Sequence, residues 1–490
     1  MKRIVFGLSV LGALAIAVGV ATSSVRANDL PNADASSPAR IQTAALPDRV
    51  ADDFDVNLGM TPDPAKGYEL LMNAVMASPV FKEKDIERLW NVWEDDEKAK
   101  AEAASEDERR RMTFERYGWQ TRPEGDSKLP FGYIPDGKGN MLTNCFVCHG
   151  GKVAGKTIPG AGNTHVDLTT LATDVQKLAA FDRGADYKNI PDVKAPFNTP
   201  LTQHRGNTNA VIFAPVFAAL RTPALAKEYT AHPEKLLHHD INPPAWWNFK
   251  KKERIYCDAF APKTPRQLMP FAMSPTFDDA KFHSFEPNFV HIKAYIESLE
   301  APKYPYPIDA ALAAKGKVLF EKSCSECHGT YGADGKFPSK VVDIEKLGTD
   351  PRRLQAIDID RRNATNSGWL QYGGKYPVDL ESKGYLAQPL DGIWASAPYL
   401  HNGSVPTLHA LFNVDERPAI WKRDEDGYDQ ARVGLNVEKF DAIPAGINSR
   451  QYRMYYDTSI PGSNATGHLF PDERLDRNEK LAVMEYLKTL

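Results

Sequence analysis

The pentapeptide C-x-x-C-H occurs twice in this chain, at Cys145–His149 and at Cys324–His328. Two thiols three positions apart on one helical turn can reach the two vinyl groups of one porphyrin and form thioethers, and the histidine that follows can ligate the iron. The pattern predicts two covalently bound haem c groups, with His149 and His328 as the proximal iron ligands. The four thioether residues would be Cys145, Cys148, Cys324 and Cys327.

A C-x-x-C pair can also belong to a zinc site, a redox dithiol or a disulfide. Zinc ribbons place two such pairs about 15–20 residues apart, and the pairs of this chain are much farther apart. A thioredoxin-like dithiol follows a strand in a βαβ unit, and no such pattern surrounds either motif. The haem interpretation leaves one of the five cysteines, Cys257, which we expect to be a small buried apolar residue.

Residues 1–27 have the composition of a signal peptide. Two basic residues precede an apolar run over residues 4–20, and residues 25–27 fit a cleavage site. The run is a little short for a membrane anchor, so we expect export to the periplasm, or secretion, without stable membrane insertion. Residues 28–55 are expected to form a flexible leader.

The charge balance excludes some partners. Removal of Lys2, Arg3 and Arg26 with the signal peptide changes the formal net charge from −4 to −7. An acidic protein that also carries haem propionates is not suited to bind nucleic acid or an anionic membrane.

The remaining chain predicts a mainly α protein with two cytochrome c-like domains, long irregular loops and insertions. Proline-rich residues 301–307 cannot continue a helix and place the boundary between an N-terminal domain over 56–302 and a C-terminal domain over 303–490. Apolar periodicity predicts helices over 64–77, 82–111, 289–299, 309–322 and 478–490. Residues 184–208, 242–290 and 415–470 lack such periodicity and are expected to be long loops.

Several stretches resemble a known family. The segment Pro398-Tyr-Leu-His-Asn-Gly-Ser404 resembles the di-haem cytochrome c peroxidase superfamily. Residues 144–151, the Pro-Pro-Ala-Trp-Trp-Asn-Phe-Lys-Lys-Lys run over 243–252, and Gly467-His-Leu-Phe470 look most like its rubber-oxygenase branch. In that branch one haem binds dioxygen and cleaves an olefin, while the other has two protein ligands.

The resemblance implies that His468 is the second ligand of the second haem. Met454 is the competitor, because His/Met ligation gives a higher potential. His401 lies in a tight turn and is expected to hydrogen-bond a propionate or to hold the loop in shape. For the first haem the family offers a removable histidine or an open apolar pocket. The candidate histidines are His165, His204, His232, His238 and His239.

Aromatic and basic residues complete the candidate site. Trp246, Trp247 and Phe249 are our candidate catalytic-site residues, because adjacent tryptophans in an extended segment face opposite ways, so that one can form a pocket wall while the other packs; both can equally be core. Arg205 could neutralise a propionate. Lys250–Lys252 is more simply a solvated face, with pairing to a propionate as the less favoured alternative. Trp394 could relay electrons between the irons but is more simply a packing residue.

We therefore expect a periplasmic di-haem oxidoreductase. Its first haem would activate O2 to oxygenate or cleave an unsaturated apolar substrate, and its second would be six-coordinate for electron transfer or tuning. The alternatives are a hydrogen-peroxide reductase served by a small periplasmic electron donor, and a non-catalytic electron-transfer cytochrome.

Overall fold

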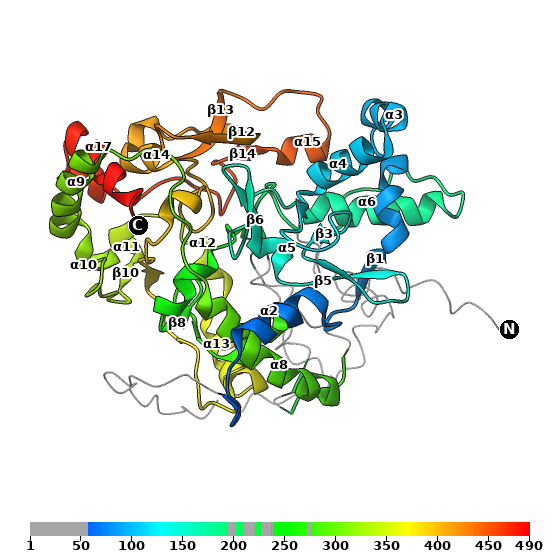
Figure 1. Cartoon of the computed structure of the whole chain (residues 1–490), viewed down its shortest axis with the longest axis horizontal. Helices are drawn as coiled ribbons and strands as arrows, with labels where there is room; N and C mark the ends of the chain where they lie inside the picture. Colours follow the sequence, from blue (N-terminus) through cyan, green and yellow to red (C-terminus); the bar gives the residue numbers. More distant parts are fainter. Residues whose placement is uncertain are drawn as a thin grey trace, which may run out of the picture.

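Two pairs of crossing helices frame the two motifs in the computed structural model, which describes residues 57–194, 201–209, 221–222, 224–226, 237, 239–271 and 277–490. In one pair, α9 (Ala310–Ser323) runs into the second motif and packs on the last helix, α17 (Arg477–Leu487). In the other pair, α2 (Pro64–Asn73) lies on α8 (Asp279–Ser298), as Figure 1 shows. The predicted signal peptide and leader, His232 and His238 lie outside the described residues.

Each of these four helices begins after an aspartate whose carboxylate accepts backbone N–H bonds of the first turn. The caps are Asp63, Asp278, Asp309 and Asp476. Such a side chain satisfies N–H groups that have no partner within the helix. Four of the predicted helices are therefore confirmed, and α8 extends ten residues beyond the predicted start at residue 289.

The helices of each pair touch at a glycine. A Cβ on Gly67 would lie 2.0 Å from the carbonyl oxygen of His291, and one on Gly316 would lie 1.8 Å from that of Ala482. In each pair a tyrosine packs on the same glycine and lies four residues after the contacted carbonyl: Tyr295 on Gly67 and Tyr486 on Gly316. The two pairs therefore share one contact pattern, as expected of two related segments.

The predicted helix over 82–111 is wrong. That stretch divides into the 3-10 helices η1 (Glu83–Glu87) and η2 (Leu89–Val92) and the helices α3 (Asp95–Ala103) and α4 (Glu106–Tyr117). Ile86, Leu89 and Val92 are buried in one core, and the backbone is extended at Trp93 and again at Ala104 before Ser105 caps α4. Burial of these apolar side chains overrides the helix propensity of the charged ones.

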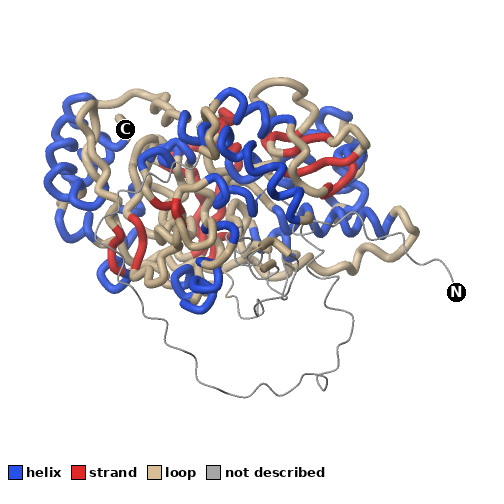
Figure 2. Tube along the Cα trace, turned by 90° about the horizontal axis from the view of Figure 1, so that it is seen from below, coloured by secondary structure: helices blue, strands red, loops and turns tan. Residues whose placement is uncertain are grey.

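Small antiparallel sheets form in part of the segments that were predicted to be loops. The predicted fold class, mainly α, did not include these sheets. Within the described residues the strands form six sheets of two or three strands, seen in Figure 2 as short pieces between helices and loops. The largest sheet lies in the predicted loop 415–470 and pairs β12 (Ile420–Asp429) with β13 (Gly434–Phe440) and β14 (Tyr455–Asp457). Trp421 pairs with Tyr456 across two strands, and their rings stack at 5.0 Å.

The other elements complete the chain. The strands are β1 (Pro79–Lys82), β2 (Gln120–Thr121), β3 (Pro130–Phe131), β4 (Tyr133–Pro135), β5 (Asn140–Thr143), β6 (Gly150–Val153), β7 (Lys156–Pro159), β8 (Arg254–Ile255), β9 (Ala261–Pro262), β10 (Val341–Asp343) and β11 (Gly384–Leu386). The helices are α5 (Phe146–His149), α6 (Leu168–Phe181), η6 (Trp246–Lys251), η7 (Pro265–Phe271), α10 (Ser325–His328), α11 (Ile344–Leu347), α12 (Arg352–Ala356), α13 (Ile359–Asn366), η8 (Trp369–Gln371), η9 (Ile393–Ala395), α14 (Leu408–Phe412), η10 (Val414–Glu416), α15 (Ser449–Arg453) and α16 (Phe470–Arg474). No described helix combines the length and apolarity that a membrane crossing requires.

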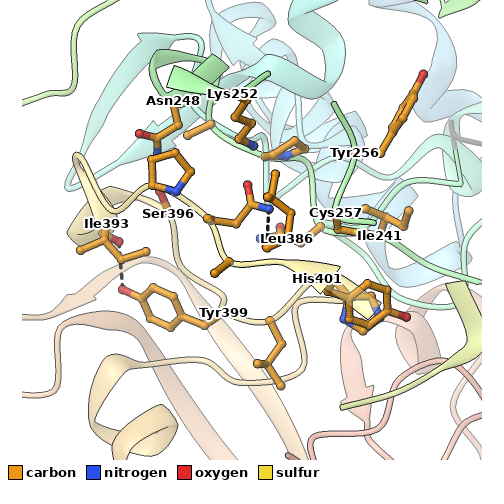
Figure 3. A pocket seen from close by; sticks show the side chains of 18 of the residues that line it. Ile241, Asn248, Lys252, Tyr256, Cys257, Leu386, Ile393, Ser396, Tyr399 and His401 are labelled. Carbon is orange, nitrogen blue, oxygen red and sulfur yellow. Dashed lines mark hydrogen bonds between the residues drawn. The ribbon is translucent and has the colours of Figure 1, made fainter. Parts of the chain in front are cut away.

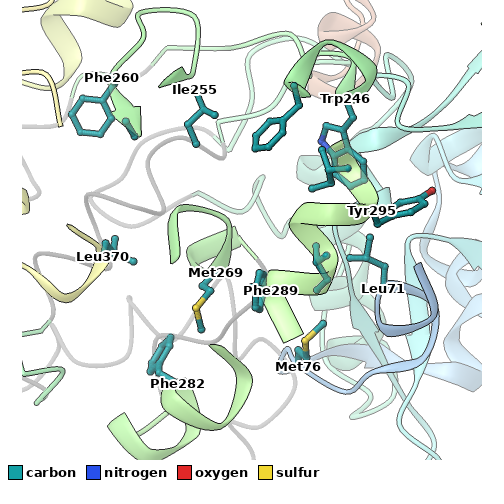
Figure 4. Packing of buried hydrophobic residues seen from close by; sticks show 14 of the residues in the cluster. Leu71, Met76, Trp246, Ile255, Phe260, Met269, Phe282, Phe289, Tyr295 and Leu370 are labelled. Atoms are coloured by element: carbon teal, nitrogen blue, oxygen red, sulfur yellow. The ribbon is translucent and has the colours of Figure 1, made fainter. Parts of the chain in front are cut away.

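The hydrophobic cores join segments from both sides of residues 301–307. One core, shown in part in Figure 4, packs Leu71 and Phe289 together with Trp369, Leu370 and Val378. A second core packs residues of α9 and α17 together with Trp247 and Ala161. The chain is irregular between α8 and α9, as predicted, but apolar packing continues across this connection.

Candidate haem centre

Both motifs face one cavity with a volume of about 640 Å³. Its wall includes the cysteines and the histidine of each motif, residues of η6 and residues of the segment 385–401; Figure 3 shows part of it. Apolar side chains dominate where η6, α8 and the chain around Leu268 meet, among them Phe249, Ile255, Ile292 and Ile296. A large apolar cavity bordered by thiols and imidazoles suits a flat apolar macrocycle with a central metal.

The two motif histidines make the same hydrogen bond. Nδ1 of His149 lies 3.0 Å from the carbonyl oxygen of Pro244, and Nδ1 of His328 lies 2.8 Å from that of Gln388. A carbonyl oxygen only accepts, so Nδ1 carries the proton and Nε2 keeps its lone pair for a metal. Burial lowers the pKa of His149 to about 4 and also lowers the pKa of His328, which favours the neutral ligating form.

The thiols of the motifs also fit covalent attachment. All described cysteines are free of disulfides, and burial raises the pKa of Cys145 to about 12 and those of Cys148 and Cys324 to about 11. No cluster of three or more His, Cys, Asp or Glu side chains in the described part of the chain could hold a bare metal ion. Each cysteine pair thus stands with its own histidine, in the order that haem attachment requires.

His468 lies opposite His328. Their ring centroids are 6.2 Å apart with an interplanar angle of 62°. Two imidazoles that each place a nitrogen about 2 Å from one shared metal have centroids about 6 Å apart, so the spacing matches two axial ligands of one iron. Burial, followed by the charge of His328, lowers the pKa of His468 to about 3 and keeps this imidazole neutral.

The backbone before α16 fixes the position of His468. Gly467 and His468 both adopt left-handed φ values, of 76° and 53°. A Cβ on Gly467 would meet the backbone of Gly348 at 2.3 Å, and the guanidinium of Arg417 donates to the carbonyl oxygens of Ala465 and Gly467. Met454, the alternative ligand, follows α15 and lines a different, much smaller cavity.

His149 has no counterpart of His468 in ring contact with it among the described residues, since its imidazole stacks on Trp246. The histidines that line the cavity are His149, His328, His401 and His468. Of the other candidates, His165 bonds to the carbonyl oxygen of Glu425, His204 packs between Asp240 and Tyr456, and His239 bonds to the carbonyl oxygen of Leu237. The structure therefore places none of these three at the cavity.

The adjacent tryptophans diverge because they lie in the 3-10 helix η6, not in an extended segment. Successive side chains of a 3-10 helix point about 120° apart. The ring of Trp246 stacks on the His149 imidazole, with centroids 4.6 Å apart, and lines the cavity. Trp247 does not line it: its Nε1 donates to the carbonyl oxygen of Asp391 at 2.7 Å, and its ring packs in the second core. Phe249 lines the cavity.

Arg205 is not at the cavity, so its prediction as a propionate partner is wrong. Its guanidinium pairs with Glu425 and donates to the carbonyl oxygens of His165 and Glu115. His401 does line the cavity, with its ring 4.3 Å from that of Tyr385. Trp394 donates to the carbonyl oxygen of Pro302 and packs in the second core.

Two cavity residues differ from what the sequence indicated. Lys252, predicted on a solvated face, is only 8% exposed and lines the cavity. Cys257, predicted as core, also lines it, and burial raises the pKa of its thiol to about 12. The cavity forms where distant segments pack together, so the sequence around these two residues shows no periodic pattern that would predict it. In the structure the backbone changes from helical to extended at Lys252, which separates its side chain from those of Lys250 and Lys251.

One family model matches a short segment of the chain. Residues 384–422 match the family model described as RoxA-like, cytochrome c-like. This segment contains Pro398–Ser404, which carried the resemblance stated above, and the match confirms that resemblance. It also contains β11 and the wall of the cavity around Tyr399 and His401.

Two proteins of Sinorhizobium fredii (strain NBRC 101917 / NGR234) are similar to part of the chain. The uncharacterized protein y4iJ is 28% identical over 258 residues, which cover 39% of this chain and 41% of y4iJ. The uncharacterized protein y4iM is 27% identical over 234 residues, covering 40% of this chain and 52% of y4iM. The matches thus span about half of these relatives or less.

A solved structure overlaps a larger share of the chain. The crystal structure of a MauG-like protein associated with microbial copper homeostasis covers 62% of this chain and 93% of its own, at 16% identity and a TM-score of 0.26. That TM-score is too low to establish a common fold.

Proposed function

We propose that this chain, whose residues 384–422 match the family model described as RoxA-like, cytochrome c-like, is a periplasmic di-haem c oxidoreductase with one reactive haem and one electron-transfer haem. Haem 1 denotes the group attached at Cys145 and Cys148, and haem 2 the group attached at Cys324 and Cys327. The finer assignment is an oxygenase that acts on an unsaturated apolar substrate.

The unequal surroundings of the two proximal histidines carry the proposal. The rings of His328 and His468 are 6.2 Å apart, a separation at which both could ligate one iron, whereas the ring of His149 stacks on Trp246 and contacts no second imidazole among the described residues. When bound, haem 1 would supply a vacant coordination position for O2 or peroxide, and haem 2 a six-coordinate redox centre.

The protein's own groups have separate roles in this arrangement. The carbonyl oxygens of Pro244 and Gln388 hold the Nδ1 protons, so that both proximal imidazoles present Nε2. The stacked ring of Trp246 fixes the orientation of the His149 imidazole. Phe249, Ile292 and Ile296 keep water from the wall beside it and suit an apolar substrate.

One observation also favours a hydrogen-peroxide reductase. Both motifs line the same cavity, so electrons could pass from one haem to the other, and peroxide reduction needs such a supply. In that case a small periplasmic protein would be the electron donor.

Electron paramagnetic resonance of the purified protein tests the premise that the oxygenase and the reductase share, namely one haem with an open coordination position and one haem with two protein ligands. We expect one high-spin and one low-spin ferric haem, with cyanide converting only the high-spin signal. Two low-spin signals that cyanide does not perturb would refute both enzyme proposals and would favour a non-catalytic electron-transfer cytochrome. Product formation from an olefin under O2 without a donor would favour the oxygenase; peroxide consumption only with a reduced cytochrome would favour the reductase.

A further inference from the structure

Three consecutive lysines have different environments. Lys250 pairs with Glu300 at 2.5 Å, and Lys251 pairs with Asp391 at 2.7 Å; both are partly exposed to solvent. Lys252 is more than nine-tenths buried, and its ammonium group has no hydrogen-bond or ion-pair partner among the described residues. Two lysines of the run are thus neutralised by acids, while the third is left with a charge inside the protein.

Lys252 lines the same cavity as both proximal histidines. It follows η6, whose Trp246 stacks on His149, and the same cavity includes Gln388, whose carbonyl oxygen holds His328. Figure 3 shows its side chain directed toward the part of the cavity where Leu386 lies. The ammonium group therefore faces the cavity that both motifs line.

The surroundings of this ammonium group call for an anion. Burial lowers the pKa of Lys252 to about 8. Asp258, the carboxylate six residues further along the chain, does not pair with this ammonium group, because it is held by Arg353 at 3.1 Å and by Arg362 at 3.3 Å. An isolated buried charge is costly, and pairing with an opposite charge removes most of that cost.

We propose that Lys252 binds a carboxylate inside the cavity, and that this carboxylate is a haem propionate at the junction of the two haem sites. The proposal rests on the proposed di-haem function, because each haem brings two carboxylates into a cavity whose own acidic residues, Glu326 and Asp343, make no ion pair with Lys252. The residue takes the role that the sequence had suggested for Arg205, and it links the charge of one residue to the potential of a haem.

The test compares three variants of the holoprotein by spectroelectrochemical titration. In Lys252→Gln the loss of a cation near haem should favour the ferric form and shift the ratio of reduced to oxidised haem about tenfold at fixed potential, which equals about 59 mV for one electron. Lys252→Arg keeps the charge and should remain close to the native protein. Lys250→Gln removes a neighbouring lysine on the surface and should leave both potentials unchanged. Lys252→Met, which suits an apolar wall, repeats the measurement if the Gln variant does not assemble.

Equal potentials in Lys252→Gln and Lys250→Gln would overturn the propionate assignment. If Lys252→Gln instead weakened the binding of a fatty acid such as oleate with both potentials unchanged, the carboxylate would be that of a bound ligand, and the assignment would fail as well. A pyridine haemochrome assay of the native protein is read separately, because fewer than two haems per chain would refute the di-haem function itself.

Discussion

His468 illustrates how one residue is placed by its neighbours. A non-glycine residue in the left-handed region costs about 1 kcal/mol and persists only where the surroundings hold it. Here Gly467 packs on the backbone of Gly348, and Arg417 holds the preceding carbonyl oxygens. The strained backbone at His468 coincides with its position opposite His328.

Replacement of His468 by alanine should convert haem 2 from low-spin to high-spin, because the iron loses its second imidazole. Electron paramagnetic resonance measures the change as loss of the low-spin signal and gain of a second high-spin one. Met454→Leu is the matched control, since Met454 lies away from the cavity. A low-spin haem 2 that survives in His468→Ala but disappears in Met454→Leu would identify Met454 as the ligand.

At the scale of elements, one buried arginine joins the helices beside the first motif. Arg116 of α4 is 3% exposed and contacts Glu94 before α3 at 2.8 Å, Glu97 of α3 at 2.5 Å and Asp174 of α6 at 2.8 Å. Burial by itself would raise the pKa of Glu94, but the guanidinium of Arg116 outweighs it and holds this pKa at about 2.

The contact between Glu94 and Arg116 predicts that the stability of the protein decreases at acidic pH. The pKa of Glu94 is lower in the folded protein than its ordinary value of 4.5, so its contribution is complete above pH 4.5 and is lost as the pH falls toward 2. Glu94→Gln should lower the free energy of unfolding by about 1–2 kcal/mol at pH 7 and reduce the loss between pH 4.5 and 3. Urea titrations at several pH values measure both effects.

The exposed Glu102 of α3 provides the control, because Glu102→Gln should change neither the free energy of unfolding nor its pH dependence. Equal behaviour of the two variants would show that the contact between Glu94 and Arg116 does not stabilise the fold.

The helix pairs depend on their glycines. Alanine at position 316 would place its Cβ 1.8 Å from the carbonyl oxygen of Ala482, which forces α9 and α17 apart. We expect Gly316→Ala to lower the free energy of unfolding by about 1–3 kcal/mol, although alanine is the better helix former. Denaturation followed at the haem 2 Soret band measures this, with Lys315→Ala at an exposed site of the same helix as control. An equally stable Gly316→Ala would mean that the two helices are not in close contact.

At the scale of the molecule, the two haem segments share their interior. Trp369, Leu370 and Val378 belong to the core of α2 and α8, and Trp247 belongs to that of α9 and α17. Separation of the segments at residues 301–307 would expose these side chains to water, at a cost of about 25 cal/mol per Å² of apolar surface.

The full protein should therefore unfold in one cooperative transition. Calorimetry should give a van't Hoff enthalpy equal to the calorimetric enthalpy, and unfolding curves recorded at the two haems should coincide. Two resolved transitions, each belonging to one haem, would show instead that the segments over 56–302 and 303–490 are stable on their own.

The sequence alone determined the features that depend on short spacing. Two thiols and a histidine within five residues predict haem attachment whatever surrounds them, and apolar periodicity predicted the helices that frame both motifs. The resemblance of Gly467-His-Leu-Phe470 to a family pointed to His468. Arg205 was proposed from its charge alone, and the structure places its guanidinium on Glu425 and on backbone carbonyl oxygens instead.

Only the tertiary structure decided which side chains share the cavity. Trp246 and Trp247 are neighbours in sequence but belong to different cores, and Lys252 is buried although it follows two lysines that form surface ion pairs. Their environments depend on contacts with residues about 50 to 240 positions away. Local periodicity carries no information about such contacts, because they arise when distant segments pack together.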